Sequence, residues 1–333
     1  MRSVAPSMLA PPALPRDFVT RPALRATLDS GADRTLTLVC APPGFGKSLL
    51  LADWVRRAPD IPAVWVTLEE DHDDPRLFWT AVLAGLRACP AVPASSGLHR
   101  LVVSRTGVEL GFVDDVLRAL VALPRPLRLI LDDAQHLCGG PVVRHLHLLA
   151  RDSGPHVHPV LASRLDPPLP LARLRLDDDL RELRAEQLRF TRSETTTLLE
   201  RTGLHLDPGQ ADLLHERTDG WVAGLRLAAR SLRDGPDPDA FLADFSGDER
   251  TVADFLVGDV LAGIPEAQLD VLRCTSVADP IPSALAVELC GREDAADLLD
   301  ALARDLGLVT RWGPDRAEFR VQTMLRSYLA ADL

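Results

Sequence analysis

The segment from residue 35 to residue 55 constrains the fold more than any other part of the chain. An apolar, strand-like run from Thr35 to Cys40 leads into a loop rich in proline and glycine, and the helical pattern Ser48 to Val55 follows. The loop reads A-P-P-G-F-G-K-S from Ala41 to Ser48 and matches the phosphate-loop pattern G-x-x-x-x-G-K-[ST] everywhere except at its first position. Because this pattern requires a strand before it and a helix after it, we predict a phosphate-binding loop here rather than an ordinary turn.

The residue types of this loop are those that a nucleotide phosphate chain needs. Gly44 and Gly46 let backbone N–H groups curl around the β-phosphate, and the N-terminus of the following helix adds partial positive charge. Lys47, the only lysine in the chain, is expected to bridge the β- and γ-phosphates, and the Ser48 hydroxyl to bind Mg²⁺. We therefore predict ATP or ADP with Mg²⁺ as the cofactor. The predicted nucleotide-binding residues of the loop are Pro43, Gly44, Phe45, Gly46, Lys47, Ser48 and Leu49.

Two carboxylates follow a second apolar run, Leu127 to Leu131, about 85 residues after the loop. Asp132 is expected to hold Mg²⁺ together with Ser48, and Asp133 to orient or deprotonate the attacking water. Arg164 follows a further strand-like run and is expected to reach the γ-phosphate as a sensor or charge stabiliser. The predicted catalytic residues are Asp133, Lys47 and Arg164, and the predicted Mg²⁺ ligands are Ser48 and Asp132.

Strand-like runs alternate with helical ones as far as about residue 170. Further strands are predicted at Ala63 to Leu68 and Val160 to Ala162, with a helix at Leu77 to Leu86. This alternation predicts a parallel sheet flanked by helices, with its functional groups at the carboxyl ends of the strands. The fold class is thus an α/β P-loop NTPase domain at 1–170, including the N-terminal leader.

After the proline-rich segment Asp166 to Pro170, strand-like runs nearly vanish. Thr191 to Glu194 forms a capping-box pattern, and Asp207 precedes a proline as a helix N-cap does. A further helical pattern runs from Trp221 to Leu232. We predict an all-α helical domain at 171–246.

The last part of the chain combines helices with a β-hairpin. Two short strands, Leu308 to Thr310 and Glu318 to Val321, flank a turn at Gly313 to Asp315, and a last helix follows from Met324. Helices followed by a hairpin predict a winged-helix domain at 247–333. The helices expected before the hairpin are Val252 to Leu261, Ala267 to Leu272 and Ala295 to Leu306.

Composition excludes several classes of function. The chain has 48 acidic and 37 basic residues, a net charge of −11, which argues against a general nucleic-acid binder because phosphate neutralisation needs a basic face. No run approaches the roughly 18 uninterrupted apolar residues of a membrane helix, so we expect neither an anchor nor a signal peptide. Five cysteines without a C-x-x-C pair give no support to a disulfide framework. A cytoplasmic protein is expected.

In their order along the chain, these residues resemble the nucleotide-binding core of the STAND class of signal-transduction NTPases. Within that class they are similar to the large LuxR-type regulators related to the maltose-regulon activator, the MalT-like family. The resemblance covers nearly the whole chain. Besides the loop and the aspartate pair, it rests on Pro12 to Pro15, Phe18 to Arg21, Trp65 to Asp71, Asp74 to Trp79, Ala162 to Arg175, Glu182 to Ala185, Leu188 to Thr191, Gly220 to Leu225 and Phe245 to Asp248.

The resemblance implies three domains that close around ADP in the resting state. It implies that inducer binding and the exchange of ADP for ATP open this arrangement, that the ATP-bound form oligomerises, and that ATP is hydrolysed slowly. It implies that Val19 and Arg21 lie in the segment that contacts adenine, and that Gly220 and Trp221 form a turn over the nucleotide. Gln322 stands where the family normally carries a histidine that reads the β-phosphate of ADP. A glutamine can donate a hydrogen bond but cannot become cationic, so we expect weaker locking by ADP.

The sequence departs from the family pattern in two other ways, and it leaves two alternative functions open. Ala41 replaces the first loop glycine, and neither a helical-repeat sensor nor a helix-turn-helix is found, as expected of a truncated chain, a gene fragment or a stand-alone switch.

Because the winged helix of such switches packs on the nucleotide, no direct DNA binding is expected. The expected partners are the nucleotide, a second copy, and an inducer or regulatory protein. The alternatives are an AAA-like ATPase machine with a winged helix, and an inactive nucleotide-binding scaffold for a protein partner.

Overall fold

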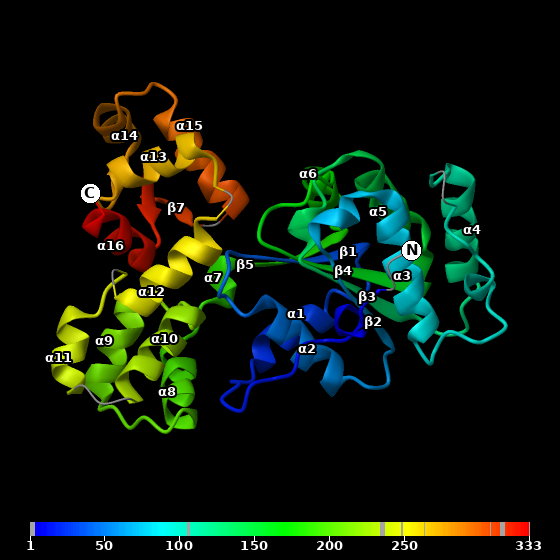
Figure 1. Ribbon diagram of the computed structural model, residues 1–333, viewed down its shortest axis with the longest axis horizontal. Coiled ribbons are helices and arrows are strands. Elements are labelled where there is room, and N and C mark those ends of the chain that lie inside the picture. Colours follow the sequence, from blue (N-terminus) through cyan, green and yellow to red (C-terminus); the bar gives the residue numbers. More distant parts are fainter. Residues whose placement is uncertain are drawn as a thin grey trace. The chain divides into compact units, whose positions relative to one another are not determined.

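The computed structural model of the chain is shown in Figure 1 and describes residues 4–104, 107–233, 237–247, 249–262, 264–306, 308–313 and 317–332. The chain forms two compact units. The first consists of Met1–Leu14, Thr20–Cys40 and Lys47–Arg184. The second consists of Pro15–Val19, Ala41–Gly46 and Ala185–Leu333. Two short pieces of the second unit, in the leader and in the predicted phosphate loop, are therefore flanked in sequence by the first.

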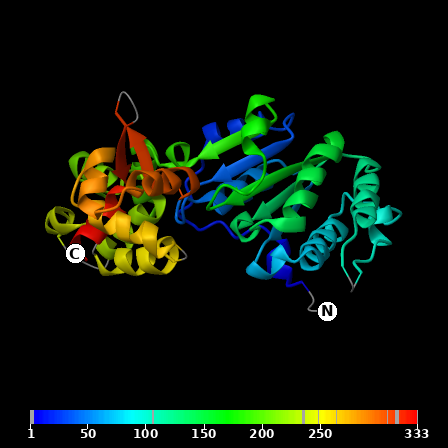
Figure 2. The ribbon, with the colours of Figure 1, turned by 90° about the horizontal axis from the view of Figure 1, so that it is seen from above.

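The first unit is built on a five-stranded sheet in the order β2-β3-β4-β1-β5, whose strands lie side by side in Figure 2. Every neighbouring pair is parallel. Each residue of β1 and β3 is buried, as expected of parallel strands covered on both faces. The predicted parallel sheet is thus confirmed. The strands are β1 Leu36–Cys40, β2 Ala63–Thr67, β3 Leu127–Asp132, β4 Val157–Ser163 and β5 Leu180–Arg184.

The helices of the first unit cover both faces of this sheet. Alternate residues of β3, such as Leu127 and Leu129, enter a core shared with α3, α4 and α5, whereas Arg128 between them meets Trp54 of α2. Successive side chains of a strand point to opposite faces, so α2 lies on the face opposite to α3. The α-helices of this unit are α1 Pro22–Asp29, α2 Lys47–Arg57, α3 Pro75–Ala88, α4 Leu110–Val121, α5 Gly140–Asp152 and α6 Leu171–Leu176.

Strand β5 was not predicted, and it lies beyond residue 170, where strand-like runs were expected to nearly vanish. Its sequence, L-R-E-L-R, is mostly charged, yet it pairs with β1 over its whole length. The strand lacks the apolar pattern by which a strand is recognised in sequence. It is stabilised instead by pairing with the buried β1 and by ion pairs between its own side chains, such as that of Arg184 Nε with Glu182 Oε1 at 3.0 Å. The parallel sheet therefore continues as far as Arg184.

The second unit is mainly helical, and its helices begin where capping chemistry predicts them. Thr191 and Glu194 exchange hydrogen bonds of 3.2 and 2.9 Å as a capping box, and Asp207 does the same with Gln210. The first part of the unit contains α7 Ala185–Leu188, α8 Arg192–Arg201, α9 Pro208–Thr218, α10 Val222–Arg233 and α11 Pro238–Asp244. Asp248, which contributes to the family resemblance, lies outside the described residues.

The C-terminal part of this unit has the predicted helices and hairpin. The hairpin strands β7 Val309–Trp312 and β8 Glu318–Val321, orange and red in Figure 2, are antiparallel, and β8 also pairs with the unpredicted β6 Ile281–Pro282. Pro314 and Asp315 of the predicted turn lie outside the described residues. The helices are α12 Arg250–Phe255, α13 Glu266–Thr275, α14 Ser283–Cys290, α15 Ala295–Ala301 and α16 Thr323–Ala331, with π-helical turns at Leu256–Val260 and Leu302–Leu306. Among the described helices, none has both the length and the apolar character needed to cross a membrane.

Candidate nucleotide-binding site

The carboxyl edge of the parallel sheet gathers the residues predicted to bind phosphate and Mg²⁺. The strand β3 ends at Asp132, and Ser163 at the end of β4 is aligned with Cys40 at the end of β1. The helix α2 begins at Lys47, directly after the glycine loop. Because parallel strands end at the same edge of a sheet, these ends bring Lys47, Asp132 and the residue after β4, Arg164, into one area.

The loop before α2 has the backbone conformation that only glycine adopts without strain. Gly44 and Gly46 have φ angles of 81° and 77°, in the left-handed region. A Cβ atom added at Gly46 would meet no heavy atom of the described residues within 4 Å. The open side at Gly46 is what a loop that wraps around phosphate requires.

Lys47 is buried, with 9% of its surface exposed, although it carries an amine. Burial lowers the pKa of Lys47 to about 8, and the charge of Arg164 acts in the same direction, while Asp132 and Asp133 oppose the shift. A phosphate chain beside this amine supplies the negative charge that restores its protonated form. The side chain is therefore suited to bind an anion at this position.

Ser48 and Asp132 form the predicted pair of oxygen ligands. The Ser48 hydroxyl donates a hydrogen bond of 2.9 Å to Asp132 Oδ1. Burial raises the pKa of Asp132 to about 6, with a smaller contribution from the negative charge of Asp133. A hydroxyl and a buried carboxylate in contact are oxygen donors of the kind that Mg²⁺ prefers, so the residues present fit this ion.

Asp133 adopts a left-handed conformation, with φ 57° and ψ 42°, which is uncommon for a residue other than glycine. Gln135 holds this carboxylate, because its Nε2 donates to Asp133 Oδ1 at 2.9 Å. The Oε1 of the same glutamine accepts from the backbone N–H of Arg164 at 3.2 Å. Gln135 thus joins two of the three predicted catalytic residues, Asp133 and Arg164. Sequence reasoning missed it, although its place two residues after Asp133 was an available signal.

The turn at Gly220 and Trp221 contacts the glycine loop directly. The Trp221 indole Nε1 donates to the Pro43 carbonyl oxygen at 3.1 Å, and Ala223 N–H donates to the Gly44 carbonyl oxygen at 3.0 Å. A Cβ at Gly44 would lie 2.5 Å from Ala223 Cβ, so the close approach itself requires glycine. All these residues belong to the second unit, and Phe45 of the same loop is also buried.

The two predicted leader residues fall in different units. Val19 belongs to the second unit, where Arg226 Nη2 pairs with Asp17 at 3.1 Å and Arg201 donates to the Phe18 carbonyl oxygen at 2.7 Å. Arg21 belongs to the first unit, is 7% exposed and precedes α1 as its N-cap residue. Both side chains are buried, and their contact with adenine stays a prediction.

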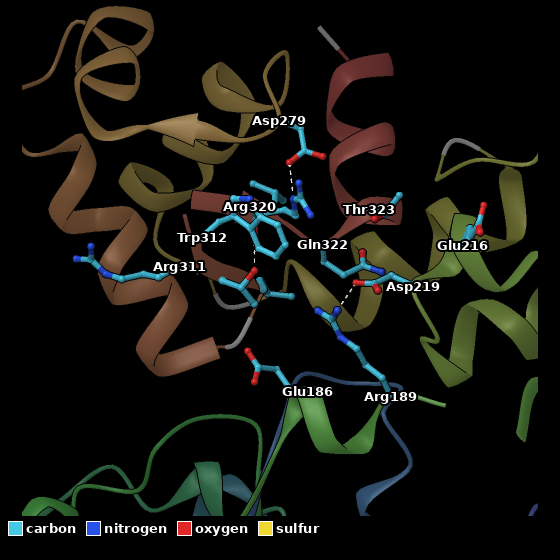
Figure 3. Close-up of a pocket in the computed structure, with 13 residues that line it drawn as sticks. Glu186, Arg189, Glu216, Asp219, Asp279, Arg311, Trp312, Arg320, Gln322 and Thr323 are labelled. Carbon is cyan, nitrogen blue, oxygen red and sulfur yellow. Dashed lines mark hydrogen bonds and ion pairs between the residues drawn. The ribbon is translucent and has the colours of Figure 1, made fainter. Parts of the chain in front are cut away.

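Gln322 lines a cavity of about 500 Å³ in the second unit, shown in Figure 3. Its Oε1 accepts from Leu325 N–H at 2.8 Å and so caps α16, while its buried Nε2 has no hydrogen-bond partner among the described residues. An ion pair of Arg189 with Asp219 forms another part of the wall. The residues that line this cavity include none of the glycine loop, and the contact of Gln322 with the β-phosphate stays a prediction.

Comparison with known families matches two separate parts of the chain. Residues 31–163 match the family model of the AAA domain, and residues 257–333 match that of the MalT winged helix domain. The Walker-type ATPase of Pyrococcus abyssi has a similar structure, with a TM-score of 0.70 at 14% identity over 96% of this chain and 98% of that one. At this identity the likeness shows the fold alone.

Two curated relatives are similar over nearly the whole chain. The serine/threonine-protein kinase PknK of Mycobacterium tuberculosis is 30% identical over 317 residues, which are 94% of this chain and 28% of that protein. The HTH-type transcriptional regulator MalT of Yersinia pestis is 29% identical over 331 residues, which are 94% of this chain and 35% of the regulator. The chain therefore spans about a third of the length of these relatives.

The parallel sheet, the glycine loop with its lysine, and the C-terminal winged helix define a P-loop NTPase that carries a winged-helix domain. The predicted fold class is confirmed. The two family models and the curated relatives then place the chain more narrowly, as a MalT-like P-loop NTPase.

Proposed function

We propose that the chain is an ATP- and ADP-binding signalling switch with slow hydrolysis, the core of a STAND-class, LuxR-type transcriptional regulator. The observation that carries this proposal is the cluster at the carboxyl edge of the sheet. A buried lysine with a lowered pKa begins the helix α2, and the next residue, Ser48, bonds to the buried carboxylate of Asp132. This arrangement is suited to a phosphate chain with a divalent cation.

Each residue of the cluster then has a role in binding or in hydrolysis. The loop residues Pro43 to Gly46 and Leu49 surround the phosphates, Lys47 bonds to the β- and γ-phosphates, and Ser48 and Asp132 hold Mg²⁺. When bound, Mg²⁺ neutralises part of the negative charge on these phosphates. Asp133, oriented by Gln135, positions the attacking water and accepts its proton, and Arg164 stabilises charge on the γ-phosphate.

The contacts of Trp221 and Ala223 with the loop support a switch over a simple hydrolase. They join carbonyl oxygens of the loop to the start of α10 within the second unit. A loop that rearranges when phosphates bind changes these two hydrogen bonds. Val19 and Arg21 contact adenine in this proposal, and Gln322 donates to the β-phosphate when the switch is closed by ADP.

The proposed organisation keeps the three predicted parts but moves the first boundary from residue 170 to the end of β5, because that strand belongs to the parallel sheet. The parts are a nucleotide-binding domain at 1–184, a helical domain at 185–246 and a winged-helix domain at 247–333. The ATP-bound form associates with further copies, and an inducer or regulatory protein controls the exchange of ADP for ATP. The winged helix serves this switch, and the chain does not itself bind DNA. The match of residues 31–163 to the AAA domain supports one alternative, an ATPase machine with rapid turnover.

Titration calorimetry with ATP and Mg²⁺ tests the proposal. The unmodified chain should bind ATP, and Lys47→Ala should lose at least about a hundredfold in affinity because the loop loses its only charged side chain. Arg118→Ala, which removes an exposed cation of α4, is the control and should bind as the unmodified chain does. Unchanged affinity in Lys47→Ala would overturn the assignment. Turnover that is rapid in the absence of any partner would favour the ATPase machine.

A further inference from the structure

The strand that ends at Asp132 begins with a buried cation that the proposed chemistry does not use. Arg128 is the second residue of β3, and its side chain is only 4% exposed. Removing a charged group from water is costly unless the group is paired. Burial lowers the pKa of Arg128, and its Nη1 has no hydrogen-bond partner among the described residues. An apolar side chain would fill this place at lower cost, so the contacts of the guanidinium need an explanation.

The principal contact of Arg128 is with the indole of Trp54 in α2. The Arg128 Cζ lies 3.7 Å from the centroid of the Trp54 ring, a cation–π distance. Arg128 Nη2 also lies 3.3 Å from Asp29 Oδ1, which accepts a hydrogen bond from Trp54 Nε1 at 2.7 Å. The Asp29 side chain is 58% exposed, so water weakens this ion pair, whereas the Trp54 indole is buried together with Arg128.

The helix α2 is therefore attached to β3 at two separate places. At its start, Ser48 bonds to Asp132 at the end of the strand, and six residues later Trp54 stacks on Arg128 near the beginning of the strand. The two places are about 9 Å apart along the helix and about 13 Å apart along the strand. One contact would let the helix pivot on the strand, whereas two separated contacts fix its direction.

The helix α1 supports the same position of Trp54 from the outside. Asp29, the last residue of α1, holds the indole N–H, and Arg25 of α1 lies 3.7 Å from the buried Asp53 of α2. Figure 1 shows α1 and α2 next to each other. The two helices are thus joined by the hydrogen bond from Trp54 to Asp29 and by the ion pair of Arg25 with Asp53. The hydrogen bond prevents Trp54 from turning away from Arg128.

We propose that Arg128 is a positioning residue for the Mg²⁺ pair: by holding Trp54 it fixes α2 so that Ser48 stays beside Asp132. The inference rests on the proposed binding of nucleotide with Mg²⁺. Arg128 lies at the end of β3 opposite to Asp132 and does not contact the Mg²⁺ ligands, yet its removal should change their positions. Lys47 precedes Ser48 at the start of the same helix, so its phosphate contact is also disturbed, but less than the Mg²⁺ pair, which requires Ser48 to stay in contact with Asp132.

The test compares ATP affinity with Mg²⁺ and with EDTA, and takes the ratio as the Mg²⁺ enhancement. In Arg128→Ala the enhancement should fall about tenfold, which is a larger change than the loss of affinity in EDTA. In a Ser48→Ala background, Arg128→Ala should have no further effect on the enhancement, because its influence passes through Ser48. A residue that only stabilises the fold would lower the unfolding temperature and leave this ratio unchanged.

Two further variants keep the test decisive. Arg118→Ala removes an exposed arginine of α4 and should leave the enhancement as it is. If Arg128→Ala does not fold, Arg128→Met keeps the length of the side chain against Trp54 and should lower the enhancement in the same direction. The inference is overturned if a folded Arg128 variant keeps the full enhancement, or if Arg128→Ala lowers the enhancement equally in the unmodified and the Ser48→Ala backgrounds. Either result leaves the proposed function intact. An unmodified chain that does not bind ATP overturns the proposed function instead.

Discussion

Trp221 Nε1 donates a hydrogen bond of 3.1 Å to the carbonyl oxygen of Pro43. Pro43 lies in the glycine loop before Lys47, and Trp221 lies at the start of α10, so this bond joins residues 178 positions apart. It links the loop that we propose to bind phosphate with the helical part of the second unit. The conformation of the loop and the position of α10 should therefore change together.

The first prediction removes this hydrogen bond with Trp221→Phe, which keeps an aromatic ring against Phe255. The Pro43 carbonyl loses its donor, so the free energy of unfolding should fall by about 1–2 kcal/mol. The rise in unfolding temperature caused by ADP should also be smaller. Calorimetry with and without ADP measures both effects. Trp79→Phe, which loses a buried hydrogen bond to His145 instead, should lower stability but keep the full ADP effect; equal behaviour of the two variants would refute the link.

The second prediction separates the two loop glycines. Both have a positive φ, so alanine at either position adds roughly 1–2 kcal/mol of backbone strain. At Gly44 a Cβ would also lie 2.5 Å from Ala223 Cβ, whereas at Gly46 it meets open space. Gly44→Ala should therefore destabilise the chain more than Gly46→Ala in urea denaturation, although both lose nucleotide binding. Equal losses of stability would mean that the contact of the loop with Ala223 does not form.

The third prediction concerns pH. Because burial lowers the pKa of Lys47 to about 8, and phosphates bind the protonated amine, ATP affinity in EDTA should be nearly constant from pH 7 to 8. Above pH 8 it should fall by about tenfold per pH unit, since each unit removes most of the protonated form. The same lowered pKa means that the unfolded chain binds more protons between pH 8 and 10.5, so Lys47 contributes a rise in the stability of the free protein over that window.

Calorimetric titrations with ATP from pH 7 to 10 measure this dependence. Lys47→Ala should bind weakly and show no fall that begins near pH 8. A flat profile in the unmodified chain would show that the amine does not bind the phosphates.

The fourth prediction separates binding from hydrolysis. Asp133→Ala should still bind ATP but should not hydrolyse it, because the attacking water loses its base. Gln135→Ala should slow turnover by about tenfold, since Asp133 loses the amide that orients it. Single-turnover assays with pre-bound ATP measure both rates. Hydrolysis at the unmodified rate in Asp133→Ala would remove this residue from the mechanism.

Local sequence patterns were sufficient to predict most of the fold. Apolar runs marked β1 and β3, and capping residues such as Thr191 and Asp207 marked helix starts, because these signals depend on neighbouring residues alone. Strand β5 was missed because its residues are mostly charged and its partner β1 lies about 140 positions away. The roles proposed for Lys47 and Ser48 could also be predicted, because both residues belong to one contiguous sequence pattern.

The contacts that complete the site depend on tertiary structure. The bond from Trp221 to Pro43 and the stacking of Arg128 on Trp54 join residues that are distant in sequence, and no local pattern marks either pair. Gln135 lies close to Asp133, but only the structure shows that it also accepts from Arg164 N–H.

The most direct measurement is to denature the purified chain and identify any released nucleotide by chromatography, with Lys47→Ala as the control. We predict about one adenine nucleotide per chain, mainly ADP, from the unmodified protein and none from the variant. A partly filled site that takes up added ATP would also agree with the proposed binding and would fit weaker locking through Gln322. A chain that releases no nucleotide and does not bind added ATP with Mg²⁺ would contradict the central claim that this is a nucleotide-controlled switch.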